Sequence, residues 1–172
     1  MPTNLQFIKK ETSTDVVSVS YTDLFNTNYN VFELFIDLQY NAVSYLDIVL
    51  LDSGGSALTG SHYDVAVQDL KSSSSFAEYK YASSTIWRGL GGYLNNVDAG
   101  YGMKMTVYNP TSTSSYTYAI SQSASPNSSE LFGTKGIAVY KATDGVYGLK
   151  INASGGGTTT FDFLNVSVYG VK

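Results

Sequence analysis

Apolar and polar side chains alternate along several segments of this chain, and the alternation limits what the chain can fold into. The clearest case is YGMKMTVY at 101–108, which places on one face Tyr101, Met103, Met105 and Val107. Successive side chains of a β-strand point to opposite sides of a sheet, so such a row predicts a strand with one face in a core. The pattern recurs at 31–38, 45–52 and 164–170. Asp47 is predicted to face away from the apolar row of Leu46, Ile48 and Leu50.

Further strands are predicted between clusters of turn-forming residues. Six segments have strand-like composition, at 5–10, 16–21, 63–68, 116–121, 136–141 and 147–151. Asp144-Gly145 predicts a hairpin that joins the last two of these segments. Because no helical pattern intervenes, we expect an all-β fold, an antiparallel β-sandwich with jelly-roll-like topology and about 8–10 strands. Residues 1–172 are expected to form a single domain.

Composition supports this fold class and excludes several partners. Only 14% of the residues are charged, whereas 15 tyrosines and 16 glycines give a bias toward pleated, half-buried surfaces. The net charge of -4 has the wrong sign for tracking a phosphate backbone, so we expect no nucleic-acid partner. The sequence has neither a run of about 18 apolar residues nor the apolar region of a signal peptide. We therefore expect no membrane partner and synthesis without a signal peptide.

Residues that could perform catalysis are sparse. His62 is the single histidine, so a Ser-His-Asp triad would have to be built around it, and no GxSxG motif accompanies it. Glycosidase-like carboxylate pairs do not stand out among the acids, which include Asp37, Asp47, Asp52, Asp64, Asp69 and Asp98. Cysteine is absent, and NNVDAGYG at 95–102 is a Gly-containing turn and not a calcium loop. We expect a protein that is not an enzyme, with no catalytic residue, cofactor or metal.

Three aromatic residues are candidates for surface contact. Trp87, Tyr93 and Tyr101 could form a platform for a sugar ring or a neighbouring subunit, because amphipathic rings are enriched at such surfaces. Packing of the rings in the core is the alternative, and it is the stronger one for Trp87. The sequence leaves both interpretations open for the tyrosines.

Several motifs, taken in chain order, carry a resemblance to a known group of proteins. They are a strand pair with a Y-x-V-F strand start within 7–39, DSGGS before YDVA within 50–67, YNP before a Ser-rich turn within 105–125, and VYGVK at the end. With this layout, which extends over nearly the whole chain, the sequence resembles small virion structural proteins of tailed bacteriophages, especially those that infect marine bacteria and cyanobacteria. The resemblance implies a jelly-roll-like domain that decorates the head or forms part of a fibre or tail appendage, and it brings no catalytic motif.

The resemblance also implies a location and partners. We expect a protein of the virion surface, made in the host cytoplasm, and a head decoration or cement protein rather than a tail component. Its partners would be the major capsid protein or other virion proteins, and further copies of itself in a closed symmetric form that is commonly a trimer in such proteins. Two alternatives stay open: a tail, fibre or capsid-appendage module that binds a host surface glycan, and an all-β glycan hydrolase.

Overall fold

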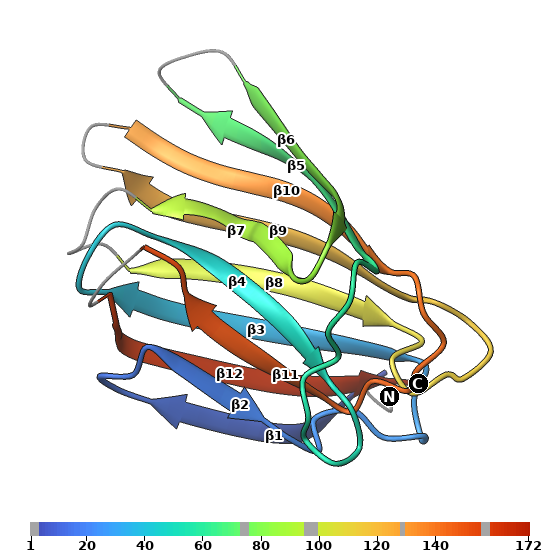
Figure 1. Ribbon diagram of the computed structural model, residues 1–172. Coiled ribbons are helices and arrows are strands. Elements are labelled where there is room, and N and C mark those ends of the chain that lie inside the picture. The colour runs from blue at the N-terminus through green and yellow to red at the C-terminus, as the bar shows by residue number, and fades with distance from the viewer. Residues whose placement is uncertain (1–3, 73–75, 95–99, 128–129, 156–158) are drawn as a thin grey trace.

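Strands make up most of the part of the chain that the structure describes (Figure 1). The structure, a computed structural model, describes residues 4–72, 76–94, 100–127, 130–155 and 159–172. These residues contain twelve strands and no helix: β1 (Leu5–Ser13), β2 (Ser18–Tyr21), β3 (Val31–Tyr40), β4 (Ser44–Leu51), β5 (Tyr63–Lys71), β6 (Ala77–Ser84), β7 (Trp87–Leu94), β8 (Tyr101–Tyr108), β9 (Thr117–Asn127), β10 (Glu130–Tyr140), β11 (Gly148–Ala153) and β12 (Phe161–Val171). In the described part of the chain, therefore, no helix could cross a membrane.

The strand order is that of a jelly roll with two added hairpins. One sheet has eight strands in the order β1-β12-β3-β8-β9-β10-β5-β6, and the other has four in the order β2-β11-β4-β7. All neighbouring strands are antiparallel. The first four strands of the larger sheet and the four of the smaller one have the order of a jelly roll's two sheets. The hairpins β9-β10 and β5-β6 extend only the larger sheet (Figure 1).

The predicted all-β antiparallel sandwich is confirmed, with more strands than expected. Each of the ten predicted segments overlaps an observed strand, and the segment 101–108 coincides with β8. The sequence pattern does not predict β6 and β7. Strand β6 is the outer strand of the larger sheet and lines the site described below, whereas β7 is the last strand of the smaller sheet and contacts β5, β9 and β10.

The core lies between the two sheets and contains the apolar rows that the alternation predicts. The row of β8 is buried, as are those of β3 and β12, whose members are Phe32, Leu34, Ile36, Leu38, Leu164, Val166 and Val168. Asp47 points away from the apolar row of β4, as predicted, but it is not the solvated aspartate expected at such a position, because the residue is only 3% exposed. Its strand, β4, lies between β11 and β7, and the Asp47 carboxylate is 3.5 Å from Nε of Arg88 on β7. The Arg88 side chain thus covers the Asp47 carboxylate on the side of β4 that faces away from the core.

Hydroxyl groups hold β7 over the added hairpins. The inner face of β9 and β10 carries Ser121, Ser123 and Thr134 at this point, whereas the inner faces of β3, β8 and β12 carry large apolar side chains. Ser121 Oγ donates a hydrogen bond to the carbonyl of Leu90 at 2.9 Å, and Ser123 Oγ donates to the carbonyl of Gly91 at 3.1 Å. Strand β7 therefore covers the inner side of the larger sheet at β9, β10 and β5, and the outer side is left to solvent.

The predicted hairpin at Asp144-Gly145 is wrong. Strand β10 lies in the larger sheet and β11 in the smaller one, so the segment between them crosses from one sheet to the other. Val146 is fully buried on the way, and its N–H donates to the carbonyl of Pro110 at 2.7 Å. The next N–H, of Tyr147, donates to the carbonyl of Leu51 at 2.9 Å. In a hairpin these N–H groups would be paired with carbonyl groups of the adjoining strand. Here they are paired with carbonyl groups of distant segments.

Candidate functional site

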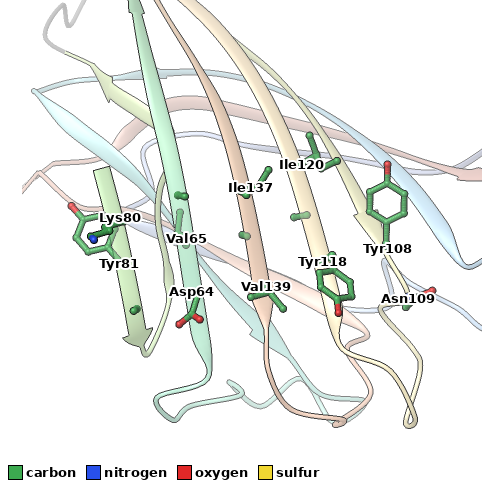
Figure 2. Close-up of a pocket in the computed structure, with 14 residues that line it drawn as sticks. Asp64, Val65, Lys80, Tyr81, Tyr108, Asn109, Tyr118, Ile120, Ile137 and Val139 are labelled. Carbon is green, nitrogen blue, oxygen red and sulfur yellow. The ribbon is translucent and has the colours of Figure 1, made fainter. Parts of the chain in front are cut away.

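A groove crosses the outer side of the eight-stranded sheet, over β9, β10 and β5. Its volume is about 760 Å³, and its floor is apolar, with Ile120, Ile137 and Val139 at the centre. Figure 2 shows Ile137 and Val139 on the middle strand, with Ile120 and Tyr118 on the strand at one side and Asp64 on the strand at the other. We call this hollow the outer groove. It is the candidate functional site, because a concave apolar surface with a few polar groups is the usual form of a binding site.

Strand register brings the floor of the outer groove together. Ile137 of β10 lies opposite Ile120 of β9, and two residues further on Val139 lies between Tyr118 of β9 and Asp64 of β5. The residues between these positions on the same strands face the core: Val65, Ala119 and Ala138. The period-two alternation therefore builds the core on one side of the sheet and the outer groove on the other.

Two tyrosines form one wall of the outer groove. Tyr108, at the end of β8, is the register partner of Tyr118 on β9. The next residue, Asn109, has a φ of 54°, a left-handed conformation that asparagine adopts more readily than most residues. Its N–H donates to the carbonyl of Asn30 at 2.7 Å, so the turn that follows Tyr108 is fixed to the loop before β3. The position of this wall is thus set by the backbone.

Asp64 is an anchored charge at the opposite wall. Its Oδ2 lies 2.8 Å from Nζ of Lys141, and its Oδ1 accepts a hydrogen bond from the N–H of Ser83 at 2.7 Å. The hydrogen bond from Lys141 and the one from Ser83 lower the pKa of Asp64. The carboxylate is therefore ionised at neutral pH and already has partners on both oxygens.

A second hollow continues the outer groove along the same strands. Its volume is about 690 Å³, and it shares Ile120, Ile137, Ala66 and Lys80 with the outer groove. Its remaining lining is more polar, with Gln68, Glu78, Gln122 and Lys135. The two hollows together form a trough across β9, β10, β5 and β6, apolar at one end and charged at the other.

A separate aromatic cluster lies at the far end of the same outer side. Phe7 of β1 and Phe35 of β3 both contact Tyr169 of β12 edge to face, with ring centroids 5.6 and 5.7 Å apart. Lys104 and Glu33 form an ion pair of 2.8 Å beside this cluster, between it and the trough. Exposed apolar side chains are therefore present toward both ends of the outer side of the eight-stranded sheet, with an ion pair between them.

The aromatic residues singled out from the sequence do not line the groove. Trp87 and Tyr101 are buried in the core, at 0% and 2% exposure, so packing is the interpretation that the structure supports for both. Trp87 Nε1 donates to the carbonyl of Val139 at 3.1 Å, and Tyr101 donates its hydroxyl to the carbonyl of Gly91. Tyr93 lies on β7 opposite Tyr45 of β4, and its side chain lies outside the described residues.

The residues of the groove floor could have been noticed in the sequence as apolar residues at outward-facing strand positions. Tyr118, Ile120, Ile137 and Val139 occupy the positions that alternate with the core positions of β9 and β10, where polar residues would be expected. Several apolar residues at outward-facing positions of neighbouring strands indicate that the outer face of the sheet is used for contact. Which strands would place such residues side by side depends on the sheet order.

Groups associated with catalysis or metal binding do not gather in the described residues. Within these residues, no three His, Cys, Asp or Glu side chains lie close enough together to hold a metal ion. His62 is exposed, and its ring contacts Tyr140 edge to face with centroids 6.0 Å apart. The segment 95–99 of the NNVDAGYG turn, which includes Asp98, lies outside the described residues.

Comparison with known proteins gives no relative from which a role could be transferred. No protein family model matches the chain, and no curated protein matches it. Among solved structures, a functionally unknown protein from Saccharomyces cerevisiae was aligned over 91% of this chain and 85% of its own, with 11% sequence identity and a TM-score of 0.27. A likeness at this level carries no argument about fold or function.

Proposed function

We propose that this chain is a non-enzymatic structural protein of a bacteriophage particle, a head decoration or cement protein that attaches to other virion proteins through the outer groove. The observation that carries the proposal is the apolar floor of the groove. Ile120 and Ile137 remain 47% and 61% exposed there, and Tyr118 beside them 45%. Contiguous exposed apolar side chains of this size mark a contact surface on a protein.

The lining of the outer groove favours a protein partner over a sugar. Sugar rings carry several hydroxyl groups around their rim, and a site for them needs several free donors and acceptors. The floor at Ile120, Ile137 and Val139 offers none, and both carboxylate oxygens of Asp64 are already engaged. Apolar side chains of a neighbouring subunit would fill such a groove without leaving hydroxyl groups unpaired.

The fold is compatible with this role and does not select it. Jelly rolls occur in viral capsid domains and also in lectin domains, so the topology by itself supports either a particle protein or a sugar-binding one. The resemblance of the sequence to small phage virion proteins adds weight to the first. We therefore place the groove's partner among the capsid proteins.

Addition of purified protein to phage heads that lack it tests the proposal. An Ile137→Asp variant places a charge on the apolar floor, and we expect its binding to the heads to fall about tenfold or more. Val17→Asp is the matched control, because Val17 is 52% exposed and lies in the segment between β1 and β2, away from the groove. Equal binding by wild type and Ile137→Asp would show that the outer groove is not the attachment site.

Mass spectrometry of separated heads and tails tests the location. We expect the chain to be present in the head fraction of particles. Its presence only in tails would overturn the head assignment, and its absence from both fractions would overturn the virion role.

Glycan binding is the second candidate, and the tyrosine wall favours it. Tyr108 and Tyr118 lie side by side at the groove, where a sugar ring could stack on an aromatic face. A glycan array read with wild type and with Tyr118→Ala separates the two candidates. Specific binding that is lost in Tyr118→Ala would favour the glycan-binding module, whereas no binding to any glycan by either protein would favour the capsid partner.

A further inference from the structure

Strand β6 is an open edge of the eight-stranded sheet. It is last in the strand order, and no further strand of the described residues pairs with it beyond β5. Its residues from Glu78 to Ser83 are all exposed, including the aromatic side chains of Tyr79 and Tyr81. An edge strand presents a row of free N–H and C=O groups, and an exposed edge of this length is a template for another strand.

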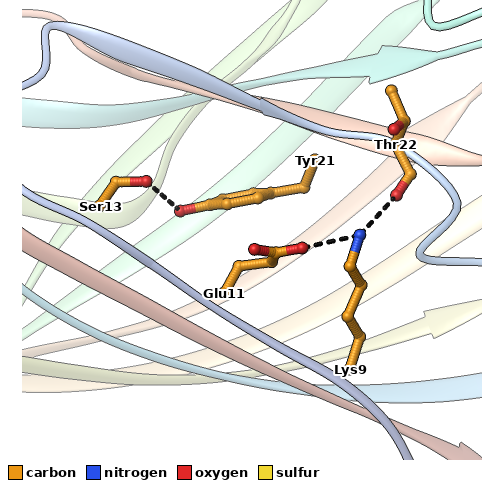
Figure 3. A network of polar contacts seen from close by, with 5 residues as sticks. All are labelled: Lys9, Glu11, Ser13, Tyr21 and Thr22. Atoms are coloured by element: carbon orange, nitrogen blue, oxygen red, sulfur yellow. Dashed lines mark hydrogen bonds and ion pairs between the residues drawn. The ribbon is translucent and has the colours of Figure 1, made fainter.

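The opposite edge of the same sheet, strand β1, is protected against pairing with another strand, whereas β6 is not. Strand β1 has a register shift between Phe7 and Lys9, and Lys9 forms an ion pair of 2.7 Å with Glu11. Figure 3 shows this pair beside Tyr21 and Thr22, and Lys9 Nζ also donates to the carbonyl of Thr22 at 3.4 Å. Irregular strands and inward-pointing charges are known means of blocking an edge. Strand β6 has its only register shift near its end, between the partners of Tyr63 and Val65.

The sequence of β6 is complementary to itself when read in the opposite direction. In an antiparallel pairing of two copies centred on Tyr79, Glu78 of each copy lies opposite Lys80 of the other. Both side chains point to the outer side of the sheet and are exposed, and neither forms an ion pair within the described residues. Opposite charges directly across a strand pair stabilise it, whereas like charges destabilise it.

The other side of β6 is complementary in size. In the same register Tyr81 lies opposite the small residue Ala77, and Tyr79 lies opposite its own copy. Tyr79 is held in place within its own chain by a hydrogen bond to the carboxyl of Asp69. Aromatic cross-strand pairs add to the stability of a sheet. The two faces of β6 thus favour one register, which is fixed by charge on one side and by size on the other.

We propose that two copies of this chain associate through β6, antiparallel and centred on Tyr79, so that their eight-stranded sheets join across a two-fold axis. The interface is isologous, because the same strand is used by both copies. Lys80 lines both hollows of the trough, so the troughs of the two copies meet at the axis and form one longer surface. This association does not depend on the function proposed above.

Cysteine cross-linking tests the register. The natural chain has no cysteine, so a Tyr79→Cys variant carries one thiol, and in the proposed pair it faces its own copy. Opposed residues of antiparallel strands have Cα atoms about 4.5–5.5 Å apart, within the range of about 4.4–6.8 Å that a disulfide requires. Tyr81→Cys is the matched control, because residue 81 lies on the same strand and on the same side. In the proposed pair the two residues 81 are displaced from each other by four positions, or about 13 Å, along the strands, too far for a disulfide.

We expect mild oxidation to convert Tyr79→Cys to a covalent dimer and to leave Tyr81→Cys monomeric. Equal cross-linking of the two variants would overturn the register. No cross-linking of either one, together with a monomeric mass for wild type in analytical ultracentrifugation up to its highest soluble concentration, would overturn the association.

A charge exchange gives a second, independent test. Glu78→Lys turns both Glu78–Lys80 pairs into like-charge pairs, and we expect it to weaken dimerisation about tenfold or more. Adding Lys80→Glu to the same chain restores opposite charges across the axis, and we expect dimerisation to return to the wild-type level. Dimerisation that is unchanged in Glu78→Lys, or that is not restored in the double variant, would contradict the proposed pairing. Both residues are exposed, so circular dichroism is expected to show wild-type folding for all variants.

Discussion

At the scale of single residues, Trp87 and Tyr101 are buried because each ring has a partner for its polar atom. The indole N–H of Trp87 donates to the carbonyl of Val139, and the Tyr101 hydroxyl donates to the carbonyl of Gly91. A buried aromatic ring adds much apolar area, and its polar atom costs little when it is hydrogen-bonded. Burial also raises the pKa of Tyr101. Both residues therefore act on stability and not on recognition.

Replacing Trp87 tests this assignment. We expect Trp87→Ala to lower the free energy of unfolding by about 3–5 kcal/mol, the range for loss of a buried aromatic side chain. Tyr118→Ala is the matched control on the surface, where truncation is expected to change the free energy by about 1 kcal/mol or less. Urea unfolding of both variants measures the difference. A Trp87→Ala variant as stable as Tyr118→Ala would place Trp87 outside the core.

Asp47 gives the fold a pH-dependent weakness. Burial raises the pKa of its carboxyl, and the hydrogen bond from Ser154 and the charge of Arg88 offset this only in part. Because the folded-state pKa is raised, protonation of Asp47 contributes to the stability of the fold. This contribution is fully present below the unfolded-state pKa of about 3.9 and is lost as the pH rises through the folded-state pKa.

Substitution of Asp47 by asparagine removes that titration. We expect the stability of Asp47→Asn relative to wild type to increase as the pH rises from about 4 toward neutrality, because the wild type then ionises a buried group. Urea unfolding of both proteins at a series of pH values measures this difference. A difference that stays constant, or that decreases, would show that ionised Asp47 is stabilised by Arg88 more than it is destabilised by burial.

At the scale of elements, strands could be predicted where one face is buried and carries a row of apolar side chains. Strands that lack such a row could not be predicted. The apolar rows of β3, β8 and β12 follow from alternation alone. Strand β6 has no apolar row because neither of its faces is covered. Strand β7 resembles a loop because it contains Gly89, Gly91 and Gly92, and its backbone is held by hydroxyl groups of β9 and β10. The sequence pattern of a short segment does not reveal hydrogen bonds to distant segments such as these.

The crossing at Asp144-Gly145 shows a second limit of local pattern. An Asp-Gly pair between two strand-like segments favours a two-residue hairpin, yet here the following strand joins the other sheet. The burial of Val146 and the bonds from this segment to Pro110 and Leu51 stabilise the crossing. The free energy of these contacts outweighs the turn preference of the dipeptide.

Gly148, at the start of β11, tests how tightly the crossing is packed. A Cβ at this position would lie 2.3 Å from the carbonyl oxygen of Tyr21, which is backbone and cannot move away without displacing β2. We therefore expect Gly148→Ala to destabilise the protein by about 1–3 kcal/mol. Gly102→Ala is the matched control in β8, where a Cβ would meet no atom within 4 Å, and we expect it to be neutral or slightly stabilising. Thermal unfolding that ranks the two variants in the reverse order would contradict this packing.

At the scale of the whole molecule, one sheet has two uses. Its inner side packs against the smaller sheet, and its outer side carries the outer groove at one end and the cluster of Phe7, Phe35 and Tyr169 at the other. The candidate site could not be predicted from the sequence, because it combines the β9-β10 hairpin with residues of β5 and β6. Strand β5 is distant from that hairpin in the chain and becomes the neighbour of β10 only in the folded sheet.

The central claim is that the chain functions by contact through the outer groove. A cryo-EM map of the phage particle at a resolution that shows side chains tests it most directly. The account predicts density for this jelly roll on the head, with Ile120 and Ile137 buried against a capsid protein. A map in which the domain is present and these side chains face solvent, or in which the head carries no such domain, would contradict it.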